Sequence, residues 1–454
     1  MAHQGFSSSV VGNLTVAQQS HFGIDLQASS LICSVHTGLM FMLGLLGSIL
    51  LKKLGSRFTQ TLAGILMVLG VGLSYFSTQV WHVYILFSIM AAAGLSFGYV
   101  ASAEILSQHF VKRKHLAFSL AVTGNFIGKS IWPMGSQFLL DKYGYSKAML
   151  FMSFPHFIHI IAGVFYISPD DQEDRTEDQK IDSDSDVSDD RSSSDDSSIG
   201  EESADQCKNG GEDEEQTIEE KKQNKEVEIK YSSKANILED RDIKEKQSIS
   251  LKDTFKLLFR DIKIWALLIN AMLWNATNTV FYVLINDYML KKTDMNGDEV
   301  AFGVTISGLA RLAASIVVAA TSCLKYDRLL LHMAAITGYS LVTIFIIFAD
   351  NQMTYYACVA LWGVCQGASI ANLVSTVNSF CEQHLLGVLF GVELFFEAFG
   401  SMALTPLATF IGVLTEEKYA LVFAGCLGML GSIILVPVAI RNHLLNRRGS
   451  LGYN

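Results

Sequence analysis

Eleven apolar segments, most of them about 20 residues long or longer, fall into a group of five and a group of six around one acidic segment. The hydrocarbon core of a bilayer is about 30 Å thick, and an α-helix needs roughly 20 residues to cross it. The backbone finds no water at that depth, so these segments are predicted to be helices. They cover residues 31–51, 58–76, 83–106, 116–140 and 148–167, and then 264–284, 301–323, 329–348, 354–377, 385–413 and 419–440. The sequence therefore predicts an all-α, multi-pass membrane protein.

Charge is distributed unevenly along the chain. Of all residues, 50% are hydrophobic and only 17% are charged, which is too apolar for a set of soluble domains. Residues 169–254 contain 29 acidic and 13 basic side chains, whereas the rest of the chain contains 15 acidic and 21 basic ones. The membrane body is basic and the connection between the two groups is acidic. This distribution implies no nucleic-acid partner.

Lysine and arginine gather in alternate connections between the apolar segments. The basic clusters comprise Lys52, Lys53 and Arg57, then Lys112, Arg113 and Lys114, then Lys325 and Arg328, and finally Arg441, Arg447 and Arg448. The connections between them are poor in both residue types, and residues 77–82 and 350–353 contain neither. The positive-inside rule therefore predicts that the basic connections, the acidic segment and the C-terminus are cytoplasmic.

The chain is predicted to have five regions. Residues 1–30 contain only a short apolar patch, so we expect the remnant of a first helix followed by an extracellular connection. Too few apolar residues lie in the acidic segment to offset its ordering entropy, so we expect a disordered loop. A solvated linker and a phosphorylation-regulated switch are both open roles for it. The remaining regions are an N-terminal helical half (31–168), the loop itself (169–254), a C-terminal helical half (255–441) and a tail (442–454).

Two parts of the sequence carry a resemblance to a known family. Basic connections at residues 52–57 and 325–328 occupy corresponding places in the two groups of helices. Two six-helix halves joined by a long cytoplasmic loop are the layout of major facilitator transporters. From residue 109 the chain reads His-Phe-Val-Lys-Arg-Lys-His-Leu-Ala-Phe-Ser-Leu-Ala-Val-Thr-Gly. This run resembles the fifth-helix signature of the monocarboxylate transporter family, solute carrier family 16, and the matching residues include Phe110, Lys112, Arg113 and Gly124.

The resemblance implies a major facilitator fold with two pseudo-symmetric halves on a twelve-helix plan, of which about eleven helices are complete here. It also implies a plasma-membrane carrier of small organic anions, and in some members a single-span glycoprotein chaperone. Lactate-carrying members have a lysine on the first helix, where this chain has Ser8. They also have an Asp four residues before an Arg on the eighth helix. Arg311 matches the Arg and Ser307 replaces the Asp, so carriers of amino acids, creatine or hormones also fit.

Polar residues inside the apolar segments supply the candidate site. A charge at the bilayer centre costs about 2.5–3.5 kcal/mol, so it usually faces protein or a water-filled cavity. Arg311 has a planar fork suited to a carboxylate, and Lys129 is a second central cation. Each has an alternative role in a structural ion pair.

Four further polar residues inside the apolar segments complete the candidate site. Glu393 and Glu397 share one helix face, where they either neutralise those cations or carry a coupled proton. Asn278 and Ser307 offer hydrogen bonds to a substrate, or they join helices.

Known enzyme and pump motifs are missing from the sequence. It has no Walker A run, and its cysteines and histidines show no metal-binding spacing. We therefore expect no catalytic residues and no cofactor. The predicted function is secondary transport of small organic anions by alternating access, with proton symport left open. The alternative is a non-transporting carrier-like scaffold or sensor.

Overall fold

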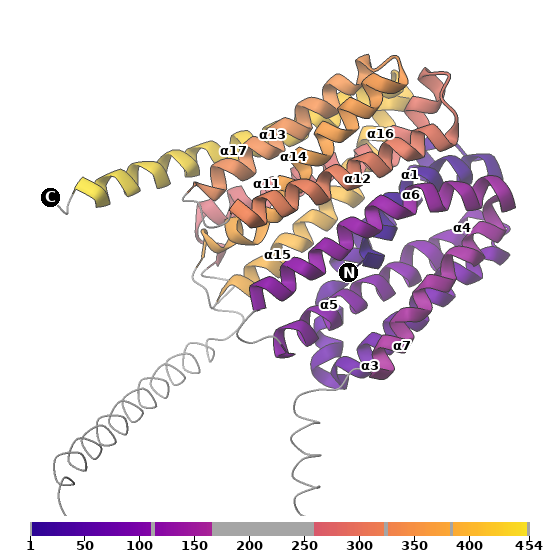
Figure 1. The fold of residues 1–454 in the computed structure, drawn as a ribbon, viewed down its shortest axis with the longest axis horizontal. Coiled ribbons are helices and arrows are strands. Elements are labelled where there is room, and N and C mark those ends of the chain that lie inside the picture. Colours follow the sequence, from indigo (N-terminus) through magenta and orange to yellow (C-terminus); the bar gives the residue numbers. More distant parts are fainter. Residues whose placement is uncertain (1, 110–113, 166–257, 322–325, 382–384, 452–454) are drawn as a thin grey trace, which may run out of the picture. The chain divides into compact units, whose positions relative to one another are not determined.

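Helices account for nearly every residue of the computed structural model, which describes residues 2–109, 114–165, 258–321, 326–381 and 385–451 (Figure 1). The first half contains α1 (Ala2–Phe22), α2 (Leu26–Met42), α3 (Gly44–Leu73), α4 (Val80–Val83), α5 (Ala92–His109), α6 (Lys114–Ser153) and α7 (Phe157–Phe165). The second half contains α11 (Ile262–Lys292), α12 (Gly297–Ala320), α13 (Arg328–Phe345), α14 (Gln352–Asn378), α15 (Leu386–Phe399), α16 (Thr405–Leu414) and α17 (Glu417–Leu451). Within the described ranges there is no strand, which confirms the predicted all-α class.

The helices match the predicted apolar segments. In the described part of the chain, nine helical segments are long and apolar enough to cross a membrane, and α2 is a shorter apolar helix. Short π-helical stretches, η2 (Tyr84–Ala91) and η7 (Gly400–Leu404), link α4 to α5 and α15 to α16. The chain reverses within α3 at Gly55 and within α6 at Gly144, where φ is 78° and 72°. Only glycine adopts such left-handed angles without a steric cost, so each of these helices supplies parts of two spans.

The first 30 residues differ from the remnant and connection that the sequence predicted. α1 is a continuous helix of 21 residues, and α2 begins at Leu26. Val10, Val11 and Leu14 on α1 are completely buried. α1 packs against α6 and α11, so its buried polar residues Asn13, Thr15 and Gln18 meet protein rather than lipid. A search for lipid-facing apolar runs therefore underestimates the length of this helix.

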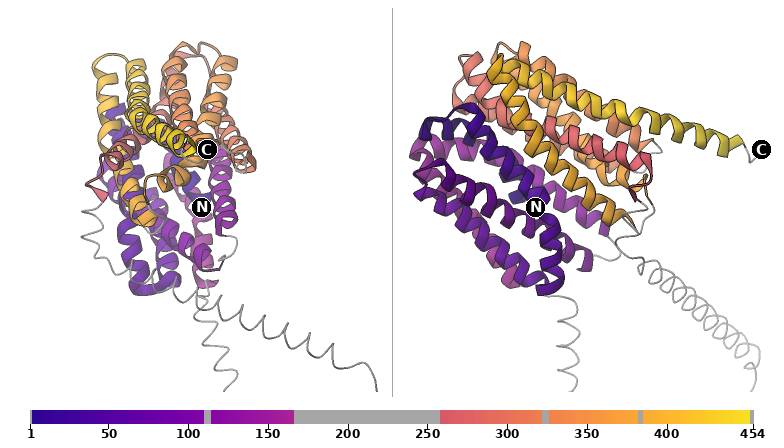
Figure 2. Two further views of the ribbon diagram at one scale, coloured as in Figure 1. Left: turned by 90° about the vertical axis from the view of Figure 1, so that its left-hand side faces the viewer. Right: turned by 180° about the vertical axis from the view of Figure 1, so that it is seen from behind.

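The short connections between helices mark one side of the molecule. Residues 23–25, 293–296 and 415–416 join consecutive helices there, and we call this the short-loop side. The opposite, long-loop side carries Gly55 and the ends of α7 and α11 that flank residues 166–257. The predicted acidic loop lies outside the described residues, and α17 continues to Leu451, past the predicted start of the tail. Figure 2 shows the helices of residues 2–165 gathered beside those of residues 258–451.

Candidate functional site

Arg311 is completely buried in the middle of α12. Its Nη2 donates a hydrogen bond to the Tyr282 hydroxyl on α11 at 2.6 Å, whereas Nε and Nη1 have no partner. The guanidinium carbon lies 5.4 Å from the ring centroids of Tyr282 and Trp362, and 6.0 Å from that of Phe126. These rings come from α11, α14 and α6 respectively. The aromatic faces stabilise the cation, but they leave two of its nitrogens free to bind an acceptor.

Glycines on α14 determine where Arg311 lies. A Cβ atom on Gly363 would come 2.3 Å from the backbone oxygen of Ser307, and one on Gly367 would come 2.5 Å from that of Arg311. Residues 363 and 367 form a small-xxx-small pair, which allows two helix backbones to approach closely. The Ser307 hydroxyl donates to the Val304 carbonyl at 2.7 Å, so it is engaged within its own helix.

Lys129 approaches the same aromatic ring from the first half of the protein. It lies on α6, its side chain is 7% exposed, and its Nζ is 5.6 Å from the Tyr282 ring centroid. Gly308 of α12 permits this approach, because a Cβ there would lie 2.8 Å from the Lys129 backbone oxygen. No carboxylate in the described ranges forms an ion pair with Lys129 or Arg311. The structure thus brings the two predicted cations together without the structural ion pairs that were the alternative.

Glu393 and Glu397 are buried on α15, where they are 0% and 2% exposed. Both carboxylate oxygens of Glu393 and the Oε1 of Glu397 lack a hydrogen-bond partner. A direct contact that would neutralise Arg311 or Lys129 is therefore not formed within the described ranges. The two carboxyl groups therefore lie on α15 without a cation or hydrogen-bond donor at these oxygens in the described ranges.

The polar residues of α11 mainly hold helices together. Asn275 donates to the Glu397 backbone oxygen at 2.8 Å and to the Ser401 hydroxyl at 2.9 Å. The Oδ1 of Asn278 accepts a hydrogen bond from Gln366 on α14 at 3.2 Å. These bonds connect α11 to α15, η7 and α14. Of the residues that match the family signature, Gly124 lies half-buried on α6, whereas Phe110, Lys112 and Arg113 lie outside the described residues.

Asn13 joins the two halves on the short-loop side. Its Nδ2 donates to the Pro133 carbonyl and to the Ser136 hydroxyl, each at 2.8 Å, and its Oδ1 accepts from Asn286 on α11. Further along α1, Gln19 donates to Asp287 at 3.1 Å. This junction could not be predicted from the sequence, because isolated amides in a weakly apolar segment form no recognisable pattern.

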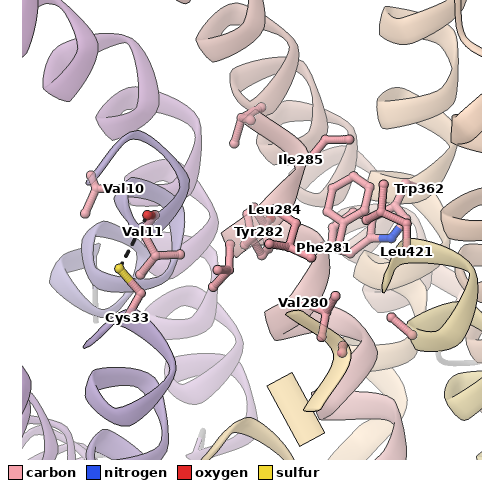
Figure 3. Close-up of a cluster of buried hydrophobic side chains, with 14 of the residues drawn as sticks. Val10, Val11, Cys33, Val280, Phe281, Tyr282, Leu284, Ile285, Trp362 and Leu421 are labelled. Carbon is pink, nitrogen blue, oxygen red and sulfur yellow. Dashed lines mark hydrogen bonds between the residues drawn. The ribbon is translucent and has the colours of Figure 1, made fainter. Parts of the chain in front are cut away.

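Apolar side chains reinforce the same junction. Val10, Val11 and Cys33 from the first half lie in one buried cluster with Tyr282 and Leu284 of α11 (Figure 3). Ser30 on α2 also donates to Thr409 on α16 at 3.1 Å. The two halves are therefore packed together on the short-loop side.

Asn13→Ala is expected to loosen this junction. Interhelical hydrogen bonds in membrane proteins contribute about 0.6–1.7 kcal/mol. The fraction of molecules in which the two halves separate on the short-loop side should therefore rise roughly three- to twentyfold. Cys33 is 0% exposed and reports on opening. Its rate of modification by a maleimide, followed by peptide mass spectrometry, should increase accordingly. The exposed Ser20 on the same helix provides the control Ser20→Ala, and equal rates in both variants would show that Asn13 does not hold this side closed.

The sequence profile of the Major Facilitator Superfamily matches residues 4–406. The chain belongs to this superfamily. Monocarboxylate transporter 6 of Mus musculus is 35% identical over 107 residues, which are 24% of this chain and 23% of the relative. Monocarboxylate transporter 6 of Homo sapiens is 31% identical over 140 residues, 31% of this chain and 28% of the relative. The matched segments thus span about a quarter of the length of these curated relatives.

Solved structures share the fold over nearly the whole chain. A POT family transporter superposes with a TM-score of 0.67 at 11% identity, covering 97% of this chain and 93% of that one. A D-xylose–proton symporter gives 0.65 at 10% identity, covering 95% and 94%. At such identities the likeness shows the fold alone, and it confirms the predicted major facilitator architecture. The superfamily members and structural neighbours named here are transporters rather than enzymes.

Proposed function

We propose that this protein is a secondary transporter of small organic anions of the monocarboxylate type. The observation that carries the proposal is the Arg311 guanidinium, which is completely buried with two nitrogens unpartnered. A buried cation is costly unless it is paired, so its vacant donors favour an anionic substrate. The planar guanidinium fork donates two parallel hydrogen bonds to the two oxygens of a carboxylate.

Lys129 adds a second positive charge from the other half of the protein. A substrate held by both residues contacts both halves at once, which is the arrangement that alternating access requires. We include Asn278 and Ser307 in this site, because Asn278 is one helical turn from Tyr282 on α11 and Ser307 is one turn from Arg311 on α12. We place the short-loop side outside the cell and the long-loop side in the cytoplasm, with the plasma membrane as the location.

Uptake of labelled monocarboxylates, amino acids and creatine into cells that express this chain tests the proposal. We expect saturable uptake of at least one carboxylate, with surface labelling as the control for expression. Co-expression of a single-span glycoprotein tests whether surface delivery needs a chaperone. Absence of all uptake at a normal surface level would instead support a scaffold or sensor.

Proton coupling is expected to depend on the carboxylates of α15. We assign the coupled proton to Glu393, because neither of its oxygens has a partner and α15 brings it one turn from Glu397. When a proton is carried together with the monocarboxylate, an inward proton gradient drives uptake. We therefore expect such a gradient to raise uptake several-fold. Glu393→Gln should remove this stimulation, whereas the exposed Asp350→Asn should retain it. If the proton gradient still stimulates uptake in Glu393→Gln, Glu393 does not carry the coupled proton. The proton would then be carried by Glu397 or by neither of the two residues.

A further inference from the structure

Tyr282 on α11 contacts the Arg311 guanidinium in two ways. Its hydroxyl accepts a hydrogen bond from Nη2 at 2.6 Å, and its ring centroid lies 5.4 Å from the guanidinium carbon. A phenylalanine ring would present a comparable aromatic face to the cation. The hydroxyl is therefore the group that distinguishes tyrosine at this position.

This hydroxyl has a hydrogen that its bond to Arg311 does not use. A phenolic oxygen that accepts from a guanidinium can still donate its own proton to another acceptor. Within the described ranges, the Tyr282 hydroxyl forms no second hydrogen bond. The side chain is 2% exposed, and a buried donor without an acceptor is unfavourable. An acceptor group of a bound ligand would satisfy it.

Packing holds the Tyr282 ring in place. The ring meets Trp362 edge-to-face, with centroids 5.3 Å apart and planes at 88°. The backbone oxygen of Tyr282 faces Gly12 of α1, where a Cβ atom would come within 2.6 Å of it. Both ends of the residue are therefore fixed, and the hydroxyl stays beside the guanidinium.

A carboxylate bound to Arg311 would lie next to this hydroxyl. Nε and Nη1 of Arg311 have no partner, and they are attached to the same carbon as the Nη2 that bonds to Tyr282. An ionised carboxylate has about four acceptor positions on its two oxygens. Two hydrogen bonds from the guanidinium leave some of these positions open, so the hydroxyl has an acceptor within the same ligand group.

We propose that Tyr282 is a substrate-binding residue, whose hydroxyl donates to the carboxylate that Arg311 holds. The inference rests on the proposed function, because it adds a donor to the same site. The hydroxyl is uncharged, so its contribution does not depend on the protonation state of a buried ion. Together the two residues offer hydrogens to the ligand, which selects an acceptor-only group such as an ionised carboxylate over a neutral acid or amide.

Uptake of labelled propionate by cells that express the whole chain tests the inference. The carboxylate is the only polar group of propionate, so the hydroxyl has no other acceptor on it. We expect Tyr282→Phe to raise the half-saturation concentration about ten- to a hundredfold, the effect of one hydrogen bond to a charged group. The maximal rate per surface-labelled protein should stay nearly the same, because the ring and its packing are kept. Tyr288→Phe on the same helix is the matched control, since the Tyr288 hydroxyl donates to the Ile347 backbone oxygen.

A second pair of variants separates direct binding from positioning of the guanidinium. Arg311→Lys removes Nη2 and with it the hydrogen bond to Tyr282. If the hydroxyl binds the substrate itself, Tyr282→Phe should also raise the half-saturation concentration in the Arg311→Lys background. A hydroxyl that acts only through the guanidinium would have no further effect there.

Stabilisation of the purified chain by propionate gives the same comparison without transport. A bound ligand raises the unfolding temperature in detergent, and the dependence on propionate concentration gives the affinity of each variant. An unchanged affinity in Tyr282→Phe, or a loss confined to the chain that retains Arg311, would overturn the inference and leave the carboxylate carrier intact. Absence of both uptake and stabilisation in the unmodified chain would overturn both proposals.

Discussion

Arg311→Ala is expected to lower uptake by at least about thirtyfold, because removing one partner of a buried charge pair costs about 2–5 kcal/mol. The guanidinium is the group with free donors beside Lys129, so its loss removes the carboxylate contact itself. Surface expression should be retained, since Arg311 makes one side-chain hydrogen bond and no ion pair in the described part of the structure. Initial uptake rates normalised to surface-labelled protein measure the effect.

Two further variants show which property of Arg311 matters. Arg311→Lys keeps the charge without the planar fork, so it should recover only part of the uptake. Arg260→Ala removes an exposed arginine outside the site and should leave uptake unchanged. Uptake at the unmodified rate in Arg311→Ala would place the carboxylate elsewhere and remove Arg311 from the site.

Gly367→Ala is expected to destabilise the protein by about 1–3 kcal/mol, the usual cost of forcing an extra methyl group into a packed contact. The new Cβ would lie 2.5 Å from the Arg311 backbone oxygen, and a backbone atom cannot rotate away. α12 must therefore move, which also displaces the guanidinium. Both the unfolding temperature in detergent and the uptake rate should fall.

Gly391→Ala is the matched control on α15. The substitution is identical, but nothing lies within 4 Å of the added Cβ. Alanine is also the better helix former by about 1 kcal/mol, so this variant should be as stable as the unmodified chain or more so. An equal loss of stability in the two variants would show that the contact between α14 and α12 is not responsible.

Much of the candidate site could be predicted from single residues. Arg311, Lys129, Glu393 and Glu397 stood out because charge within an apolar segment is costly and therefore rare. Their mutual arrangement could not be predicted. Sequence left open whether the carboxylates neutralise the cations, whereas the structure keeps the two sets unpaired within the described ranges.

The aromatic surroundings of Arg311 were not predicted either. Phe126, Tyr282 and Trp362 are ordinary residues for apolar helices, and they come from three segments far apart in the chain. Nothing in their spacing marks them as neighbours of a guanidinium. The junction at Asn13 was not predicted for the same reason, since the hydrogen-bond partners of Asn13 lie on α6 and α11.

The sequence by itself determined the number, length and order of the membrane helices after residue 30, together with their division into two groups. It could do so because the thickness of the hydrocarbon core imposes a length on each segment independently of its neighbours. Tertiary structure alone decided the burial of α1, the lack of pairing between the buried cations and the buried carboxyl groups, and the close approach of α12 to α14. These features depend on which small side chains let distant helices touch, and in a bilayer that packing is selected by shape rather than by hydrophobicity.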